Sequence, residues 1–371
     1  MTAEIAGHPI HVEHENDDLT VNLTSRDGEI DGVSYLDVEI TADQPTRPGL
    51  VKITWEMPVV DMHQRTGSQR QTKLCGMGRP RTAASAARNA PVWSIYNYAG
   101  DNRLTYAVAD AINSCELGNK HAEETARITC RIDLLTDPVP PLTEYHTIIR
   151  FDQRNLKYHD ILRDVADWWA GMDAYTPAPV PETARRPMYS TWYTFHLDIT
   201  PEQIERQCEL AKELGMEAVI VDDGWQTEVK HRGYAYCGDW EVAESKFPDF
   251  RAHVDRVHAM GMKYLLWYSV PFVGVHTKAY ERFKDKFLNP DNDGEWFVLD
   301  PRFPDVREYL IGIYERALKE WDLDGFKLDF VDCFNTHEST KPAFGDGRDY
   351  ESVPEAADRL LTDVMQRLRA I

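Results

Sequence analysis

The sequence lacks the close spacings of cysteine and histidine that bind zinc or form a redox pair. Its six cysteines are scattered along 371 residues without a C-x-x-C motif. We therefore expect reduced thiols rather than a disulfide framework or a zinc site. Four further side chains that could ligate a metal, Asp332, His196, His276 and His337, form no tight motif such as H-x-H. No metal site is expected.

Basic runs and long apolar runs are also missing. The chain carries 62 Asp and Glu against 41 Lys and Arg, a formal net charge of −21. That sign disfavours a nucleic-acid partner. No apolar stretch is long enough to cross a bilayer, and residues 1–7 have neither the basic nor the apolar region of an export signal. We expect a cytoplasmic protein with a neutral ligand and without nucleic acid or membrane as partner.

The first part of the chain, residues 1–155, alternates apolar and polar side chains in short runs. Leu36, Val38 and Ile40 alternate with two acids, for example, and turn signals such as Asp27-Gly28 separate the runs. Many short strands with turns between them predict an all-β sandwich domain. The polar stretch 63–90 is expected to be a long exposed loop.

Residues 156–185 predict a helical linker. A helical pattern over residues 158–172 is followed by an extended segment, Thr176-Pro177-Ala178-Pro179-Val180-Pro181. Strands and helices then alternate over residues 186–371, in about four βα units. That order predicts the first half of a (β/α)8 TIM barrel. An open doubly wound sheet is the competing architecture, but no glycine fingerprint follows any of the expected strands.

Lys327 and Asp329 are the most informative pair in this second part. They alternate with Phe326, Leu328 and Phe330, which places both charges on one face of a strand. We expect this strand to be internal to its sheet. An ammonium and a carboxylate inside a sheet are costly to bury unless they pair or bind a polar ligand. The pair therefore marks a candidate site.

Each of the four expected strands ends in polar or aromatic residues at its carboxyl side. They are Thr191-Trp192-Tyr193, Asp222-Asp223-Gly224-Trp225, Trp267-Tyr268-Ser269 and Lys327-Leu328-Asp329. Barrel enzymes build their active sites on that face.

These strand-end residues also have structural interpretations. Asp223, which precedes Gly224, could be a helix-capping or turn residue. Trp192 and Trp267 could belong to the core or to a domain interface. Lys327 could be only an ion-pair partner needed for folding.

Carboxylates beside aromatic rings, without a metal or phosphate motif, favour a carbohydrate ligand. Indole rings pack on the C–H face of a sugar, while Asp and Lys hydrogen-bond to its hydroxyls. A retaining glycosidase uses one carboxylate as nucleophile and a second, about 5–5.5 Å away, as acid and base. Asp329 suits the nucleophile, because Lys327 would keep it ionised at neutral pH.

Taken together, these segments resemble the α-galactosidases of glycoside hydrolase family 36, in clan D. The matching pieces are Ser190-Thr191-Trp192, Val221-Asp222-Asp223-Gly224-Trp225, Trp267, Lys327-Leu328-Asp329 and the stretch from Leu299-Asp300-Pro301 to Asp305-Val306. The layout, with a β-sandwich ahead of a barrel, is also similar. The resemblance therefore covers nearly the full chain.

The resemblance implies retaining hydrolysis of terminal α-galactosides, with an α-galactoside oligosaccharide as substrate and no cofactor. Asp329 would be the nucleophile that forms a glycosyl-enzyme intermediate. Lys327 would contact ring hydroxyls beside it, and Asp222 and Asp223 would bind the hydroxyls that distinguish galactose. The remaining substrate-binding residues would be the tryptophans Trp192, Trp225 and Trp267.

Two features depart from the family pattern. Trp267 is followed by Tyr268-Ser269-Val270-Pro271-Phe272 in place of a Glu-Pro-Glu segment, which leaves room for another α-linked glycoside. The family's acid/base Asp lies on a later strand, which this chain does not reach. We therefore expect a fragment of a longer polypeptide, or a chain that needs a partner or a homo-oligomer to close the barrel. A related α-glycosidase, a galactosyl transferase and an inactive sugar-binding fragment are the alternatives.

Overall fold

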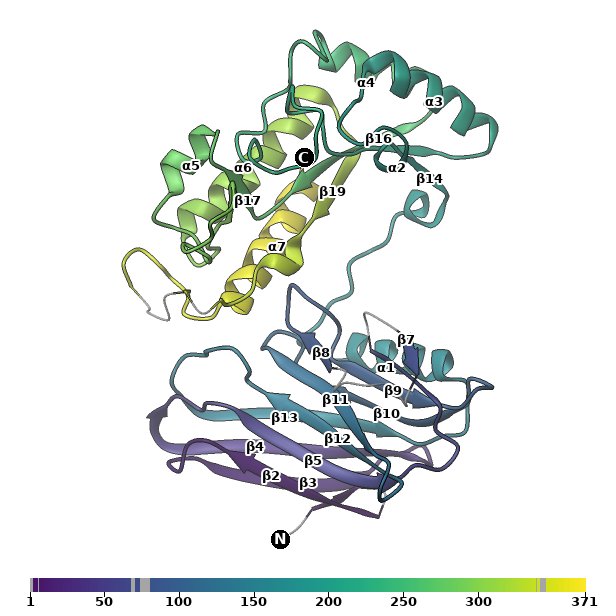
Figure 1. The fold of residues 1–371 in the computed structure, drawn as a ribbon, viewed down its shortest axis with the longest axis vertical. Coiled ribbons are helices and arrows are strands. Elements are labelled where there is room, and N and C mark those ends of the chain that lie inside the picture. The colour runs from purple at the N-terminus through teal and green to yellow at the C-terminus, as the bar shows by residue number, and fades with distance from the viewer. Residues whose placement is uncertain (1–2, 6, 68–70, 74–80, 338, 341–344) are drawn as a thin grey trace. The chain divides into compact units, whose positions relative to one another are not determined.

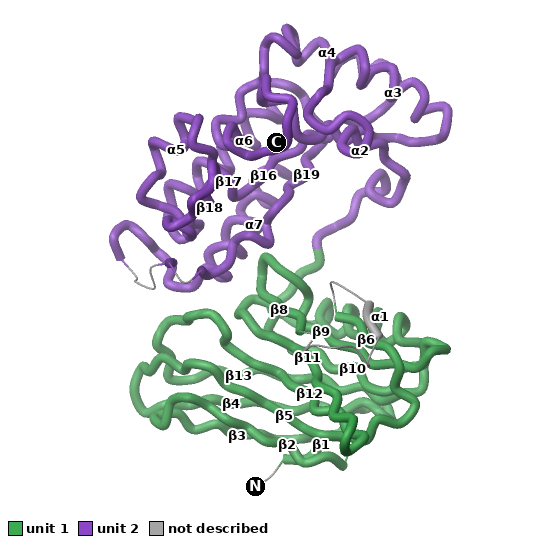
Figure 2. Tube along the Cα trace, viewed as in Figure 1, with its two compact units in different colours: residues 1–177 green, residues 178–371 purple. Residues whose placement is uncertain are grey.

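The structure is a computed structural model, and it describes residues 3–371 apart from residues 6, 68–70, 74–80, 338 and 341–344. The chain divides into two compact units, Met1–Pro177 and Ala178–Ile371 (Figure 2).

The first unit consists mainly of antiparallel strands (Figure 1). Within the described residues, one sheet has the order β1-β2-β5-β12-β11-β8 and the other has the order β3-β4-β13-β10-β9-β6-β7. The strands are β1 (Glu4–Ile5), β2 (His8–His14), β3 (Thr20–Asp27), β4 (Val33–Thr46), β5 (Val51–Pro58), β6 (Gln64–Gly67), β7 (Gln71–Lys73), β8 (Arg81–Ala84), β9 (Val92–Tyr96), β10 (Asn102–Val108), β11 (Cys115–Ala122), β12 (Arg127–Leu134) and β13 (Leu142–Asp152). The predicted all-β character of the N-terminal region is confirmed.

The alternation that predicted strands also builds the core between the two sheets. In β4, the side chains of Leu36, Val38 and Ile40 are fully buried, and they share one hydrophobic cluster with Trp55 of β5. The Trp55 ring lies edge-on to Phe151 of β13, with 5.1 Å between ring centroids. Full burial of a large apolar side chain contributes roughly 1.5–3 kcal/mol to folding. This shared cluster therefore holds the two sheets together.

The stretch 63–90 is not the long exposed loop that its polar composition predicted. It contains β6, which pairs with β9, and β8, which pairs with β11. Arg65 of β6 and Thr82 of β8 are buried although both are polar. The prediction was wrong because polar side chains face inward in these strands, so the alternation of apolar and polar residues that marks a strand is absent. Residues 68–70 and 74–80 of this stretch lie outside the described part of the chain.

Helix α1 (Tyr158–Ala170) packs on the seven-stranded sheet of the first unit. Its Val165 is buried with Val92 of β9 and Ala107 of β10. The indole of Trp169 donates a hydrogen bond of 2.9 Å to the carbonyl of Val108. The helix is thereby part of the first unit, and an extended segment with a short 3-10 helix, Glu182–Arg185, follows it.

The second unit is built on a parallel sheet with the strand order β14-β15-β16-β19 (Figure 1). The strands of the unit are β14 (Met188–Ser190), β15 (Ala218–Val221), β16 (Lys263–Ser269), β17 (Phe272–Gly274), β18 (Trp296–Val298) and β19 (Gly325–Asp329). Its α-helices are α2 (Trp192–Phe195), α3 (Pro201–Glu213), α4 (Phe250–Ala259), α5 (Lys278–Phe283), α6 (Pro304–Trp321) and α7 (Val353–Arg369).

The parallel register brings the carboxyl ends of neighbouring strands together. Val221 of β15 lies opposite Leu266 of β16, and Ser269 of β16 lies opposite Asp329 of β19. β19 is an edge strand of this sheet, and all five of its residues are half-buried. The expectation of an internal strand was therefore wrong for the described chain, because β19 pairs on one side only.

Two further parts of this unit differ from the sequence prediction. The first strand, expected to end at Thr191-Trp192-Tyr193, ends at Ser190, and α2 begins at Trp192. The chain turns there although the Thr191 N–H still donates to the Ile220 carbonyl of β15. Between β16 and α6, the antiparallel pair β17 and β18 and helix α5 form an insertion that the periodicity did not reveal.

The starts of α3 and α7 are each fixed by a capping hydroxyl. The Thr200 hydroxyl accepts the Gln203 N–H at the start of α3, and the Ser352 hydroxyl accepts the Glu355 N–H at the start of α7. Among the helices of the described chain, none combines the length and the apolar character that crossing a membrane requires.

Candidate active site at the strand ends

The carboxyl ends of β15 and β19 bring Asp222, Lys327 and Asp329 together. The Lys327 ammonium lies 2.8 Å from Oδ2 of Asp222 and 3.1 Å from Oδ2 of Asp329. The side chain of Asp222 is buried, whereas those of Lys327 and Asp329 are 35% and 33% exposed. A ligand from solvent can therefore reach the pair on β19, and Lys327 bridges it to a buried acid.

Lys327 and Asp329 help to keep each other charged. Burial by itself would lower the pKa of Lys327 and raise the pKa of Asp329. Hydrogen bonds and charge outweigh burial at both positions. Asp222 and Asp329 raise the pKa of Lys327, and Trp267 and Lys327 hold the pKa of Asp329 below its usual value. Asp329 is thus an ionised carboxylate at neutral pH, as a nucleophile must be.

Two N–H groups fix the orientation of the Asp329 carboxylate. The indole Nε1 of Trp267 donates to Oδ2 at 3.0 Å, and the backbone N–H of Phe330 donates to Oδ1 at 3.0 Å. Phe330 has a φ of 60°, in the left-handed region that bulky side chains avoid. Asp329 is therefore ionised, oriented and partly exposed, which are the properties that covalent catalysis by a carboxylate needs.

Asp223 is a buried carboxyl with one oxygen left over. Gln226 Nε2 donates to Oδ1 at 2.8 Å, whereas Oδ2 accepts no hydrogen bond from any described residue. Burial, with a smaller contribution from the charge of Asp222, raises the pKa of Asp223 to about 6. No helix starts here, since the next one begins at Phe250, so a helix-capping role does not apply. The free oxygen suits a hydroxyl donor on a ligand.

The turn after these acids requires a glycine. Gly224 has a φ of 116°, and a Cβ at this position would lie 2.7 Å from the Cα of Leu197. The backbone N–H of Asp222 donates to the Thr191 hydroxyl at 2.9 Å. The close approach of Gly224 to Leu197 and the hydrogen bond to Thr191 hold the Asp-Asp-Gly turn against the segment that follows β14.

The three tryptophans singled out from the sequence lie at different depths. Trp192, in the first turn of α2, is half-buried, and the Arg232 guanidinium lies 5.7 Å from its ring centroid. Trp225 and Trp267 are buried, with 0% and 2% of their surface exposed. Trp225 Nε1 donates to the Trp267 carbonyl at 2.9 Å, and Trp240 packs against both rings. Trp267 therefore reaches the site through its N–H rather than through a ring face, and Trp225 supports Trp267.

Sequence reasoning missed two residues that contact Asp223 or its partner. Gln226 Nε2 lies 3.9 Å from Cys237 Sγ in addition to its bond with Asp223. Burial raises the pKa of the Cys237 thiol well above its usual range, so this side chain is neutral. Both residues lie in the long segment between β15 and α4, which has no periodic pattern that could have marked them.

One group of described side chains has a spacing that a metal could use, near the amino ends of β16 and β19. Ligand atoms of Asp255, His258 and Asp322 lie within 4.8 Å of one another. Arg251 forms ion pairs with both Asp255 and Asp322, and His258 lies 2.9 Å from Asp324. Because these atoms already have partners, we assign no metal to the group.

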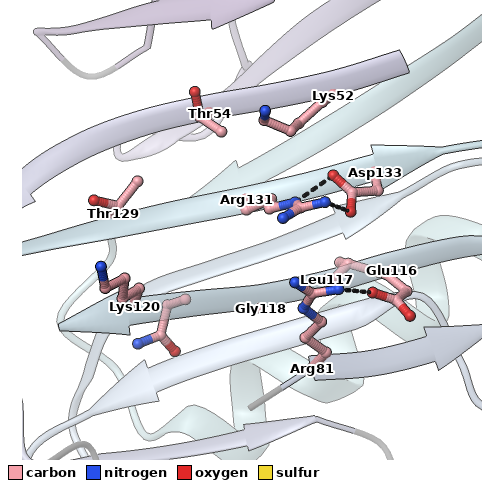
Figure 3. A pocket seen from close by; sticks show the side chains of 11 residues that line it. Lys52, Thr54, Arg81, Glu116, Leu117, Gly118, Lys120, Thr129, Arg131 and Asp133 are labelled. Carbon is pink, nitrogen blue, oxygen red and sulfur yellow. Dashed lines mark hydrogen bonds and ion pairs between the residues drawn. The ribbon is translucent and has the colours of Figure 1, made fainter. Parts of the chain in front are cut away.

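A hollow of about 220 Å³ lies over β5, β8, β11 and β12 in the first unit (Figure 3). Two ion pairs line it, Arg131 with Asp133 and Arg81 with Glu116. None of its described lining residues is aromatic. The arginines and carboxylates that line this hollow therefore pair with one another. In contrast, Oδ2 of Asp223 in the second unit has no hydrogen-bond partner among the described residues.

Similarity to known proteins extends over most of the chain. A family model described as Melibiase matches residues 177–369. The α-galactosidase Mel36A of Lactobacillus acidophilus is 27% identical over 177 residues, which cover 44% of this chain and 23% of that protein. The crystal structure of the GH36 α-galactosidase AgaB from Geobacillus stearothermophilus aligns with a TM-score of 0.64 and 15% identity, over 95% of this chain and 52% of that one.

A variant of a second Geobacillus stearothermophilus α-galactosidase, AgaA, in complex with raffinose, aligns with a TM-score of 0.64 and 16% identity, over 95% of this chain and 53% of that one. The described chain therefore has the fold seen in about half of each of these two structures, and it spans about half of their length.

Proposed function

The chain belongs to the Melibiase family, and on this premise we propose that its second unit carries the nucleophile of a retaining α-galactosidase. The supporting observation is the carboxylate of Asp329, which Trp267 and Phe330 orient and Lys327 helps to keep ionised. In this proposal Asp329 attacks the anomeric carbon as the glycosidic bond breaks, and a covalent glycosyl-enzyme forms. Water then attacks the same carbon and releases the sugar with its original configuration.

The other strand-end residues would bind the galactose ring. Lys327 and the free oxygen of Asp223 offer a donor and an acceptor to its hydroxyls, and Asp222 holds Lys327 in place. Trp192 would line the pocket with its half-buried ring. Trp225 and Trp267 would act through the orientation of Asp329.

We further propose that the parallel sheet is the first half of a (β/α)8 barrel. β14 and β19 are its two edge strands, and an edge offers backbone N–H and C=O groups to another strand. Further βα units, from a longer polypeptide or from a partner chain, would pair with both edges. The acid/base carboxyl would lie on one of them, because Asp222 is engaged with Lys327 and the free oxygen of Asp223 is assigned to a galactose hydroxyl.

The proposed substrates are α-galactoside oligosaccharides, the class to which the raffinose bound by the AgaA variant belongs. The segment Tyr268-Ser269 after Trp267 keeps an enzyme for another α-linked glycoside as the second candidate. Sugar binding without turnover is the third, and it would follow if no acid/base carboxyl joined the site.

α-Galactosyl fluoride tests the nucleophile directly, because fluoride leaves without protonation and the first step then needs no acid residue. We expect the protein to gain one galactosyl group, which mass spectrometry of peptides maps to Asp329. The Asp329→Asn variant should gain none, while Asp332→Asn, at an exposed residue three positions later, should be labelled like the wild type. A label on another residue, or no label at all, would refute the assignment.

A further inference from the structure

The ammonium of Lys246 joins two backbone segments that are separate in the sequence. Its Nζ donates hydrogen bonds to the carbonyl of Leu197, at 2.8 Å, and to the carbonyl of Gly224, at 2.9 Å. Leu197 follows α2, and Gly224 belongs to the Asp-Asp-Gly turn. Neither carbonyl accepts a backbone N–H from the described residues. Lys246 is therefore a donor that both oxygens share.

The two segments are packed too closely for another side chain to lie between them. A Cβ at Gly224 would lie 2.7 Å from the Cα of Leu197 and 2.7 Å from its carbonyl oxygen. Two carbonyl oxygens that converge on one point need a donor between them, because unpaired polar groups in a partly buried place cost free energy. Lys246, which is half-buried, supplies that donor.

The backbone around Lys246 is anchored next to the same turn. The Lys246 N–H donates to the Ala243 carbonyl, and the Ala243 N–H donates at 2.9 Å to the carbonyl of Trp225, the residue after Gly224. The following residue, Phe247, is buried. The side chain of Lys246 therefore starts from a fixed position, which reduces the entropy lost in reaching both carbonyls.

Hydrogen bonds hold Gly224 on both sides. Its N–H donates at 3.1 Å to Oε1 of Gln226, whose Nε2 donates to Asp223. Its carbonyl accepts the hydrogen bond from Lys246. The peptide groups before and after Gly224 are thus both fixed, and they set the position of the Asp223 side chain.

Lys246 also interacts with Asp223 through its charge. Burial is the main cause of the raised pKa of Asp223; Gln226 opposes it, and the charge of Lys246 opposes it to a smaller extent. Burial lowers the pKa of the Lys246 ammonium, and Glu228, Asp198 and Asp223 counteract that effect. Lys246 is therefore coupled to Asp223 both through the backbone and through space.

We propose that Lys246 is a positioning residue of the galactose site, which holds the Asp-Asp-Gly turn so that Asp223 presents its free oxygen to a sugar hydroxyl. This inference rests on the proposed function. Both described hydrogen bonds of Lys246 go to backbone carbonyls, so it acts through the turn. Its loss should weaken sugar binding and leave the chemical step at Asp329 unchanged.

Calorimetric titration with galactose at pH 7.5 tests this role. Lys246→Met should weaken galactose binding by about 10-fold, part of the effect of losing a hydrogen bond to a charged group. Lys246→Arg keeps the charge and can donate to both carbonyls, so its affinity should stay within about 3-fold of wild type. The rate of labelling by saturating α-galactosyl fluoride should change by less than about two-fold in both variants, because only binding is affected.

Lys230→Met is the matched control. Lys230 lies in the same segment and forms an ion pair of 2.6 Å with Asp198, and its side chain is 65% exposed. The variant removes the same charge as Lys246→Met without removing a described bond to the turn. It should leave galactose affinity unchanged.

A double-mutant cycle separates positioning from a general loss of fold. If Lys246 acts through Asp223, Lys246→Met should weaken galactose binding by less than about 3-fold in an Asp223→Asn background. Loss of fold would instead weaken binding equally in both backgrounds.

Unchanged galactose affinity in Lys246→Met, or equal weakening in both backgrounds, would overturn the positioning role and leave the galactose site standing. Equal weakening by Lys230→Met would overturn it too, because loss of charge alone would then explain the effect. Absence of galactose binding by the wild type would overturn the proposed function, and the role of Lys246 with it.

Discussion

The indole N–H of Trp267 donates a hydrogen bond of 3.0 Å to Oδ2 of Asp329, the same oxygen that lies 3.1 Å from the Lys327 ammonium. A neutral donor and a cation therefore stabilise one carboxylate oxygen together. Both hold the pKa of Asp329 below its usual value against the opposing effect of burial. Because one partner is neutral and the other charged, substitution can separate their contributions.

Trp267→Phe should move the acid limb of the reaction with α-galactosyl fluoride to higher pH. The substitution keeps an aromatic ring but removes the donor, so the pKa of Asp329 rises and the nucleophile is protonated at a less acidic pH. The rate at neutral pH should fall as well, because the carboxylate loses one of its two orienting N–H bonds. Rate constants measured from about pH 4 to pH 8 check this prediction.

Trp240→Phe is the control for that experiment. Trp240 is buried and packs against the Trp267 ring, with 5.8 Å between centroids, but its described contacts do not include Asp329. We expect this variant to lose stability without a shift of the acid limb. An equal shift in both variants would mean that packing, rather than the hydrogen bond, sets the pKa of Asp329.

Lys327→Met should destabilise the second unit by about 2–3 kcal/mol. Asp222 is buried and would lose its ion-pair partner. A buried charge without a partner costs roughly 3–5 kcal/mol. We expect a loss at or below the low end of this range, because Lys327 is partly exposed. The double variant Lys327→Met/Asp222→Asn should recover part of the loss, because neither charge is then left. Denaturant unfolding of the single and double variants measures the coupling. Strict additivity would contradict the pairing.

Asp223→Asn should stabilise the protein near pH 7.5 and have little effect near pH 3.5. The pKa of Asp223 is raised to about 6, so the folded state favours the neutral carboxyl. Stability from this group is present below the unfolded-state pKa, close to 4, and is lost as the pH rises through about 6. Asparagine stays neutral throughout and avoids that loss, which is on the order of 2–3 kcal/mol.

Thermal unfolding of Asp223→Asn and wild type at several pH values checks the sign. The difference in melting temperature should grow between about pH 4 and pH 6 and then level off. A difference that does not depend on pH would show that Asp223 is not the titrating group. The same variant should bind galactose more weakly at pH 7.5, because the amide replaces a charged acceptor.

Phe330→Gly should be more stable than Phe330→Ala by about 1 kcal/mol. Both variants remove the same ring, and they differ mainly in how well residue 330 tolerates its φ of 60°. An L-residue pays roughly 1–2 kcal/mol in this region relative to glycine, which is partly offset by the greater freedom of glycine in the unfolded chain. Denaturant midpoints of the two variants measure the difference. Equal stability would argue against strain at this position.

Local patterns in the sequence already determined the all-β first part, the βα order of the second and the shared face of Lys327 and Asp329. They could do so because a strand alternates its side chains with a period of two, and because parallel strands bring their carboxyl ends to one edge. The same rules placed Asp222 and Asp223 at that edge. None of these inferences needed contacts between distant segments.

Only the tertiary structure decided which of these groups meet and how deep they lie. Lys327 pairs with Asp222, 105 residues earlier in the chain, and β19 lies at an edge of the sheet instead of inside it. Trp225 and Trp267 are core residues rather than exposed platforms, while Tyr234 and Trp296, from segments without periodicity, pack against each other. The burial of a side chain and the identity of its interaction partner depend on how separate segments pack against one another. A local pattern of residues does not determine that packing.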